Sequence, residues 1–424
     1  MKKLILVAAA CVAVLAPAAS AQTPPRDVAE RVAAAIEQNF FDEARARTIA
    51  AEVRANAAAG RYDRANPADL ASALTATLSP HDGHFRVEFL PPPPQTSGPP
   101  SPGVGNNARA AYGIPNVTMY PGGVGAIDMR MFAHFNMQNP ATMPAKAAID
   151  AAMTLVGGAQ ALVFDLRDCA GGSPAMVGYL VGHFAPEGAD IYNTFRNRDG
   201  EGRELPPAPP ATGRRLDTPL FIIVSGRTGS ACESFAYTLQ SAGRAIIVGE
   251  ASGGAANPGG LIPVGDNLAV FVSGGTPINP ITGRNWEGAG VQPNVAVPVA
   301  EALTRARELA LEAALRAPAD EAAATEARWA LDELRAANTL YPRNLRQYAG
   351  DYGARSVAIE NDRLVLRRDR RPALVLLPLG TDEFAVTGAA PLQRLRFERD
   401  ARGRIIAMTL SLVGGQQFRD LRQS

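Results

Sequence analysis

Residues 220–239 read LFIIVSGRTGSACESFAYTL, and this stretch indicates which kind of fold to expect. Its first part, Leu220 to Val224, is entirely apolar, which is typical of a strand covered on both faces of a parallel sheet. After a turn that contains glycine, apolar residues return at a spacing of four, which predicts a helix from Ala231. The stretch therefore predicts an α/β fold with Ser230 at a strand-to-helix turn.

The same alternation of apolar runs and helical patterns continues on both sides of this stretch. Further strands are expected at 161–166, 245–248 and 268–272, and helices are expected to begin at Pro144 and at Ser173-Pro174. Chains of this kind form one sheet with helices on its faces. Residues 111–300 are therefore predicted to form an α/β core.

Regions of different character flank this core. Residues 22–90 are predicted to form a helical subdomain of three helices that ends in a half-buried strand at 85–89, and residues 91–110 form a Pro- and Gly-rich loop. Residues 301–340 are predicted to be a helical connector. Residues 341–424 show short alternating runs separated by turn signals, which predicts a small antiparallel β domain, either a barrel or a sandwich.

The first 21 residues have the features of a secretory signal peptide. Lys2 and Lys3 precede an apolar stretch, and Ala19-Ser20-Ala21 fits the small-residue pattern of a cleavage site. We expect an exported protein, periplasmic or secreted, with no membrane span after cleavage; an uncleaved N-terminal anchor is the alternative. The formal net charge of +1 gives no reason to expect a nucleic-acid partner.

Residues that bind metals are scarce in this sequence. Signal cleavage would leave the two cysteines Cys169 and Cys232, and the four histidines show no metal-ligand spacing. The glycine-rich segments match neither the phosphate-loop pattern nor the dinucleotide fingerprint. We therefore predict no metal and no cofactor.

The local pattern around Ser230 has two interpretations. The free N–H groups of the following helical turn suit a nucleophile, because they can stabilise an oxyanion. Ser230 and Glu233 also form a capping box, and capping serines far outnumber nucleophiles. A nucleophile needs a base and an acid that orients the base. Either His84 or His81 fits the first role, although each could equally be an exposed loop residue. Glu287 fits the second role, although an isolated carboxylate is more commonly a surface loop residue.

A glycine-rich turn follows the strand predicted at 161–166. Residues 165–174 read DLRDCAGGSP, so Gly171 and Gly172 lie between a strand and a capped helix. Such a turn exposes N–H groups that can bind an anion. The alternative is a tight turn that needs glycine only for its backbone geometry.

Four segments taken together resemble the tail-specific (C-terminal-processing) serine peptidases, in the branch like interphotoreceptor retinoid-binding protein and the tricorn core. In chain order they are Asp82-Gly83-His84, residues 165–174, Ser230-Ala231-Cys232-Glu233, and residues 279–293, which read NPITGRNWEGAGVQP. The resemblance covers about residues 28–300. Each motif alone is weak, but four in this order are specific.

The resemblance implies a ClpP/crotonase-like α/β core behind a small helical domain. It also implies hydrolysis of a peptide or protein substrate through an acyl-enzyme. Carried over by position, Ser230 is the nucleophile, His84 the base and Glu287 the residue that orients the base. The oxyanion hole would consist of the N–H groups of Ala231 and of Gly171 or Gly172.

The chain departs from this family in several places. The better-known branch uses a Ser–Lys dyad, but the corresponding turn at 252–257 contains no Lys, which favours His84 as the base. The chain also lacks the room between Phe89 and Tyr112 for the PDZ domain of that branch. Cys169 stands where the family commonly has Asn, which puts the oxyanion turn in doubt. The C-terminal region loosely resembles lipocalin-like modules.

Cys169 and Cys232 lie within two of the four segments, so we expect them to lie close together. A disulfide between them would fix the glycine turn to the helix after Ser230, and two buried free thiols are the alternative. Two other functions stay open for the whole chain. One is a non-catalytic or weakly catalytic binding protein for apolar ligands or peptides, and the other is an esterase-type acyl hydrolase.

Overall fold

The computed structural model describes residues 23–64, 66–90, 104–336 and 339–423. The predicted signal peptide and most of the predicted Pro- and Gly-rich loop lie outside these residues. The chain divides into two compact units. The N-terminal unit combines the chain up to residue 95 with residues 260–272, and the main unit contains residues 96–259 and 273–424.

Three helices form most of the N-terminal unit. They are α1 (Pro25–Asn39), α2 (Glu43–Ala58) and α3 (Pro67–Leu78), as predicted. The side chains of Asp42 and Asn66 accept hydrogen bonds from the first turns of α2 and α3, which fixes where these helices begin. Their buried faces carry Val, Ile, Leu and Ala and enclose an apolar core.

A three-stranded antiparallel sheet completes this unit and corrects one prediction. Its order is β1 (Arg86–Phe89), β10 (Leu268–Ser273) and β9 (Gly259–Gly265). The run at 268–272 was predicted to be a strand of the α/β core. It instead pairs with β1, with Val270 opposite Val87, and packs its apolar side chains against the three helices. An apolar run indicates burial, but it does not indicate which sheet buries the strand.

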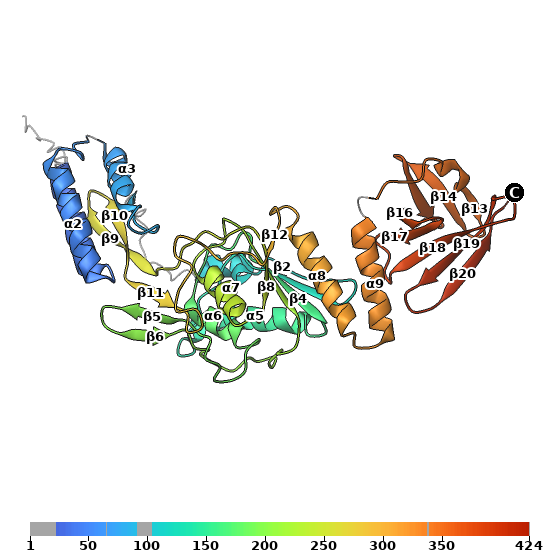
Figure 1. The fold of residues 1–424 in the computed structure, drawn as a ribbon, viewed down its shortest axis with the longest axis horizontal. Helices are drawn as coiled ribbons and strands as arrows, with labels where there is room; N and C mark the ends of the chain where they lie inside the picture. Colours follow the sequence, from blue (N-terminus) through green and yellow to red (C-terminus); the bar gives the residue numbers. More distant parts are fainter. Residues whose placement is uncertain (1–22, 65, 91–103, 337–338, 424) are drawn as a thin grey trace, which may run out of the picture. The chain divides into compact units, whose positions relative to one another are not determined.

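A six-stranded sheet forms the centre of the main unit (Figure 1). Its order is β12 (Val295–Ala296), β8 (Ile246–Gly249), β7 (Leu220–Val224), β4 (Ala161–Asp165), β3 (Val124–Asp128) and β2 (Asn116–Tyr120). Every neighbouring pair is parallel except β2 and β3. The predicted α/β fold class is confirmed.

Helices cover both faces of this sheet, since alternate strand residues contribute to two separate apolar clusters. One face packs against α5 (Met143–Leu155), α6 (Pro174–Val181) and α7 (Ala231–Ser241). The other packs against α8 (Ala302–Arg316) and α9 (Glu321–Ala336). The segment predicted to be a connector therefore supplies the second helical layer. A small sheet of β11 (Gly275–Ile278), β5 (Thr194–Asn197) and β6 (Glu201–Arg203) lies in the same unit.

The C-terminal β domain is an antiparallel meander of eight strands, which confirms the predicted class. The strands are β13 (Gly350–Tyr352), β14 (Arg355–Glu360), β15 (Arg363–Arg367), β16 (Leu374–Gly380), β17 (Glu383–Val386), β18 (Gln393–Arg399), β19 (Ile405–Leu412) and β20 (Gln417–Leu421). A bridge between Tyr352 and Arg422 brings the first and last strands together, so the sheet curls towards a barrel.

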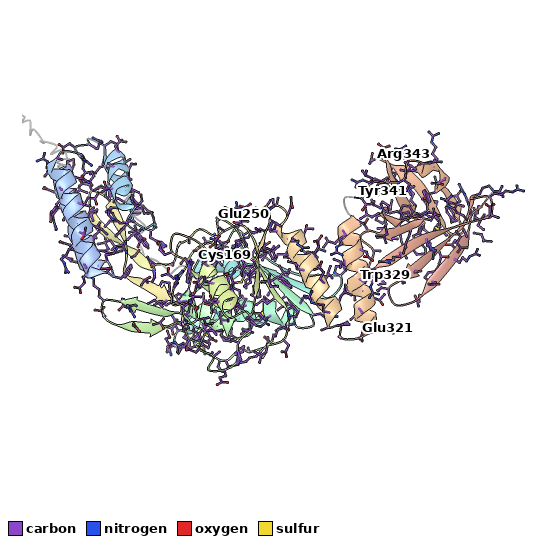
Figure 2. The ribbon with its side chains drawn as sticks, in the orientation of Figure 1. Cys169, Glu250, Glu321, Trp329, Tyr341 and Arg343 are labelled. Carbon is purple, nitrogen blue, oxygen red and sulfur yellow. A yellow bond between two sulfur atoms is a disulfide. The ribbon has the colours of Figure 1, made fainter. Side chains whose placement is uncertain are left out.

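The β domain contacts α9 through charged and aromatic side chains. Asp332 of α9 forms an ion pair with Arg394 of β18. The same guanidinium lies 4.8 Å from the centroid of the Trp329 ring, which Figure 2 labels. In the part of the chain that the structure describes, no helix has the length and apolar composition needed to cross a membrane.

Candidate active site

Ser230 has an unusual backbone conformation at the start of α7. Its φ is 51° and its ψ is −119°, whereas a helix-capping serine normally adopts an extended conformation. A positive φ costs a non-glycine residue about 1–3 kcal/mol and persists where the surrounding structure holds it, often at active sites. A strained strand-to-helix turn of this kind presents the nucleophile in α/β-hydrolases. The conformation therefore favours a chemical role beyond capping.

The glycine turn after β4 packs directly against this serine. Gly171 and Gly172 have φ values of 130° and 140°, which side chains rarely adopt. A Cβ atom on Gly171 would lie 2.9 Å from the Cβ of Ser230, and one on Gly172 would lie 2.1 Å from the Phe132 carbonyl oxygen. Both positions therefore need glycine, for backbone geometry and for space.

Two links hold the glycine turn to the nucleophile helix. Cys169 and Cys232 form a disulfide with their Cα atoms 6.0 Å apart, and both are fully buried (Figure 2 labels Cys169). The N–H of Gly229 also donates to the Cys169 carbonyl at 2.9 Å. The structure thus contains the hypothesised disulfide rather than two free thiols.

Three backbone N–H groups next to Ser230 are the candidates for the predicted oxyanion hole. Ala231 is the first residue of α7, where an N–H has no partner within the helix. Among the described residues, the N–H groups of Ala231, Gly171 and Gly172 donate no hydrogen bond. Preorganised donors of this kind stabilise negative charge that develops on a carbonyl oxygen.

Glu233 is a buried carboxylate that holds the surrounding loops together. Its Oε2 accepts hydrogen bonds from the N–H groups of Ser230 (2.7 Å) and Ala255 (2.9 Å). Its Oε1 accepts from Ser252 Oγ (2.5 Å) and from the Gly254 N–H (2.6 Å). Burial raises the pKa of Glu233, and these four donors counteract that rise. The predicted capping box of Ser230 and Glu233 is thus present, and it is part of a larger hydrogen-bond network.

Glu287 lies on the loop that follows β11 in the same unit. Its Oε2 accepts from the N–H groups of Ala256 (2.7 Å) and Asn257 (3.0 Å), which directly follow the segment bound by Glu233. The Gly288 N–H donates to the Gly254 carbonyl at 2.9 Å. Glu287 is therefore connected to Ser230 through one continuous set of hydrogen-bonded loops.

His84 belongs to the N-terminal unit, where Asp82 holds it. Asp82 Oδ1 lies 3.3 Å from His84 Nδ1 and also accepts the His84 backbone N–H at 2.8 Å. The His84 ring stacks on Phe271 of β10, with the ring centroids 5.8 Å apart. The competing His81 instead contacts Glu52 of α2 at 2.9 Å.

The structure therefore groups most of the predicted site residues, and it adds two. Ser230, Ala231, Gly171, Gly172, Cys169 and Cys232 lie together in the main unit, with Glu287 joined to them by hydrogen bonds. His84 lies in the other unit, so the predicted relay through His84 stays a prediction. The two additions are Asp82 and Glu233. The sequence analysis did not predict that Asp82 orients His84, and it predicted only a helix-capping role for Glu233. The Asp-x-His spacing was the available signal for Asp82.

The core sequence matches a known family. Residues 123–297 match the family model described as Peptidase family S41. Over these residues, which are less than half of the chain, the sequence is similar to peptidase family S41. The matched region includes Ser230, both glycines, the disulfide and Glu287, while His84 precedes it.

Solved structures similar to this chain share little sequence with it. They include a lipoprotein from Streptococcus agalactiae (TM-score 0.46, 11% identity, covering 70% of this chain and 98% of that one). A putative peptidase from Parabacteroides merdae has a TM-score of 0.44 and 17% identity, and the match covers 65% and 90% of the two chains. The photosystem II D1 C-terminal processing protease has a TM-score of 0.41 and 13% identity, and the match covers 65% of this chain and 94% of that one.

Proposed function

We propose that this protein is an exported serine peptidase that cleaves peptide bonds through an acyl-enzyme on Ser230. The observation that carries the proposal is the strained Ser230 turn at the N-terminus of α7, packed against Gly171. A helix cap alone would need neither this conformation nor a paired glycine turn. The S41 match to residues 123–297 supports the same reaction class.

In the proposed reaction His84 accepts the proton of the Ser230 hydroxyl as Oγ attacks the substrate carbonyl carbon. The N–H groups of Ala231 and of the glycine turn bind the oxyanion. His84 then returns the proton to the leaving amine, and water hydrolyses the resulting ester by the same route. Asp82 or Glu287 orients the His84 ring.

The test is hydrolysis of an unfolded protein substrate, such as reduced casein, by the mature chain. We expect Ser230→Ala and His84→Ala each to lower kcat/KM by several orders of magnitude. Ser241→Ala is the matched control, because Ser241 ends the same helix and should leave activity unchanged. Full casein hydrolysis by Ser230→Ala would overturn the proposal. If the protein cleaved small esters but not peptides, its function would be that of an esterase and not of a peptidase.

A further inference from the structure

The C-terminal β domain contains a cavity that the proposed hydrolysis does not use. Its volume is about 310 Å³, at the lower end of the range for small-molecule sites. Strands β14 to β16 and β18 to β20 form its walls. Leu366, Leu374, Leu410 and Leu412 give these walls an apolar surface.

The charged residues that line this cavity are all arginines: Arg355, Arg368 and Arg371. The Arg355 side chain is 8% exposed, forms an ion pair with Asp420 at 2.5 Å, and lies over the Phe418 ring. Arg368 and Arg371 belong to the basic loop between β15 and β16 and are exposed. Asp369 lies 3.8 Å from Arg368. Among the described residues, Arg371 forms no ion pair, so the cavity keeps a positive charge at its rim.

We propose that this cavity binds an anionic amphiphile, with an acidic head group at Arg368 and Arg371 and an acyl chain along the leucines. Apolar walls gain free energy by removing an acyl chain from water. The Arg371 guanidinium, which forms no ion pair among the described residues, offers strong, charge-assisted hydrogen bonds to an acidic head group, and Arg368 adds a second positive charge beside it. The site depends on the β domain alone, and therefore not on the peptidase reaction.

Isothermal titration calorimetry of the full mature chain can test both parts of the ligand. Decanoate carries the acid and the chain, acetate carries only the acid, and decyltrimethylammonium carries the chain with the opposite charge. We expect decanoate to bind at least tenfold more tightly than either of the others. Equal binding of decanoate and decyltrimethylammonium would overturn the proposal.

Variants locate the site and separate a single bound molecule from a membrane surface. Arg368→Glu/Arg371→Glu should weaken decanoate binding about tenfold or more, whereas Arg402→Glu, in the turn before β19, should have no effect. Wild-type affinity in the double variant would refute the assignment. Sedimentation with phosphatidylglycerol vesicles without any binding of decanoate would also refute it, because the arginines would then contact a lipid surface and not a ligand in the cavity.

Discussion

At the scale of single residues, Glu233 is expected to matter as much for activity as for folding. Its two oxygens accept four hydrogen bonds, one of them from the N–H of Ser230. Glu233→Gln turns an NH₂ group towards two of these donors, which leaves buried N–H groups unsatisfied at a cost of about 1–3 kcal/mol. We expect a lower melting temperature and a kcat/KM reduced by at least tenfold.

The matched control for this change is Glu250→Gln. Glu250 is exposed and accepts one backbone hydrogen bond, from the N–H of Val299 at 3.0 Å. Its replacement should change the free energy of unfolding by less than about 0.5 kcal/mol and leave activity intact. If both variants behave alike, Glu233 does not position the Ser230 turn.

Glu204 should make the stability of the protein depend on pH. It is buried next to α7, where its Oε2 accepts from Ser234 Oγ (2.7 Å) and Asn193 Nδ2 (3.2 Å). Burial raises the pKa of Glu204 from 4.5 to about 8. Between these values the folded protein holds a proton that the unfolded chain releases, so stability falls as the pH rises, by up to about 1.4 kcal/mol per pH unit.

Chemical denaturation from pH 5 to pH 9 measures this dependence. Glu204→Gln keeps the shape of the side chain but cannot ionise, so it should remove the contribution of Glu204 to the slope and gain stability relative to wild type as the pH rises. Glu201→Gln, an exposed neighbour on β6, should keep the wild-type slope. An unchanged slope in Glu204→Gln would show that the Glu204 carboxyl is already ionised at neutral pH.

At the scale of structural elements, the glycine turn after β4 should tolerate no side chain. Gly171→Ala places a methyl group 2.9 Å from the Cβ of Ser230 and 3.4 Å from its Oγ, so the turn or the serine must move. We expect activity to fall by at least a hundredfold, because small displacements of catalytic groups have large effects. Gly158→Ala has open space around its Cβ and should retain activity. Equal activity of the two variants would contradict the packing described above.

The disulfide should stabilise both the fold and the site. It closes a loop with a sequence separation of 63 residues. The loss of chain entropy in the unfolded state gives a contribution of about 4 kcal/mol to the free energy of unfolding. This is an upper value, because the reduced unfolded state can retain structure. Cys169→Ser/Cys232→Ser, or wild type under reducing conditions, should therefore melt at a lower temperature and lose activity. Identical melting curves with and without a reducing agent would show that the bond does not form in solution.

Local sequence signals predicted the helices and strands around the site. Contacts between distant segments could not be predicted in this way. The strand, turn and helix at 220–239 each follow from their own residues. The placement of β10 beside β1 does not, because an apolar strand fits any buried sheet. The Glu233 network was likewise beyond local reasoning, since three of its four donors lie about twenty residues downstream.

At the scale of the whole molecule, the predicted chemistry draws on both compact units. Ser230, the glycine turn and Glu287 lie in the main unit, and His84 with Asp82 lies in the N-terminal unit. The S41 match includes residues 260–272 of the N-terminal unit but neither Asp82 nor His84. These two residues enter the predicted chemistry through the family resemblance of the Asp82-Gly83-His84 motif. The account therefore depends first on whether Ser230 is a nucleophile.

Covalent labelling with a fluorophosphonate, followed by mass spectrometry of the tryptic peptides, tests this claim most directly. We predict an adduct on Ser230 of the mature wild-type protein, no adduct on Ser230→Ala, much slower labelling of His84→Ala, and normal labelling of Ser241→Ala. An adduct of equal extent on wild type and Ser230→Ala, or none on folded wild type, would contradict the account.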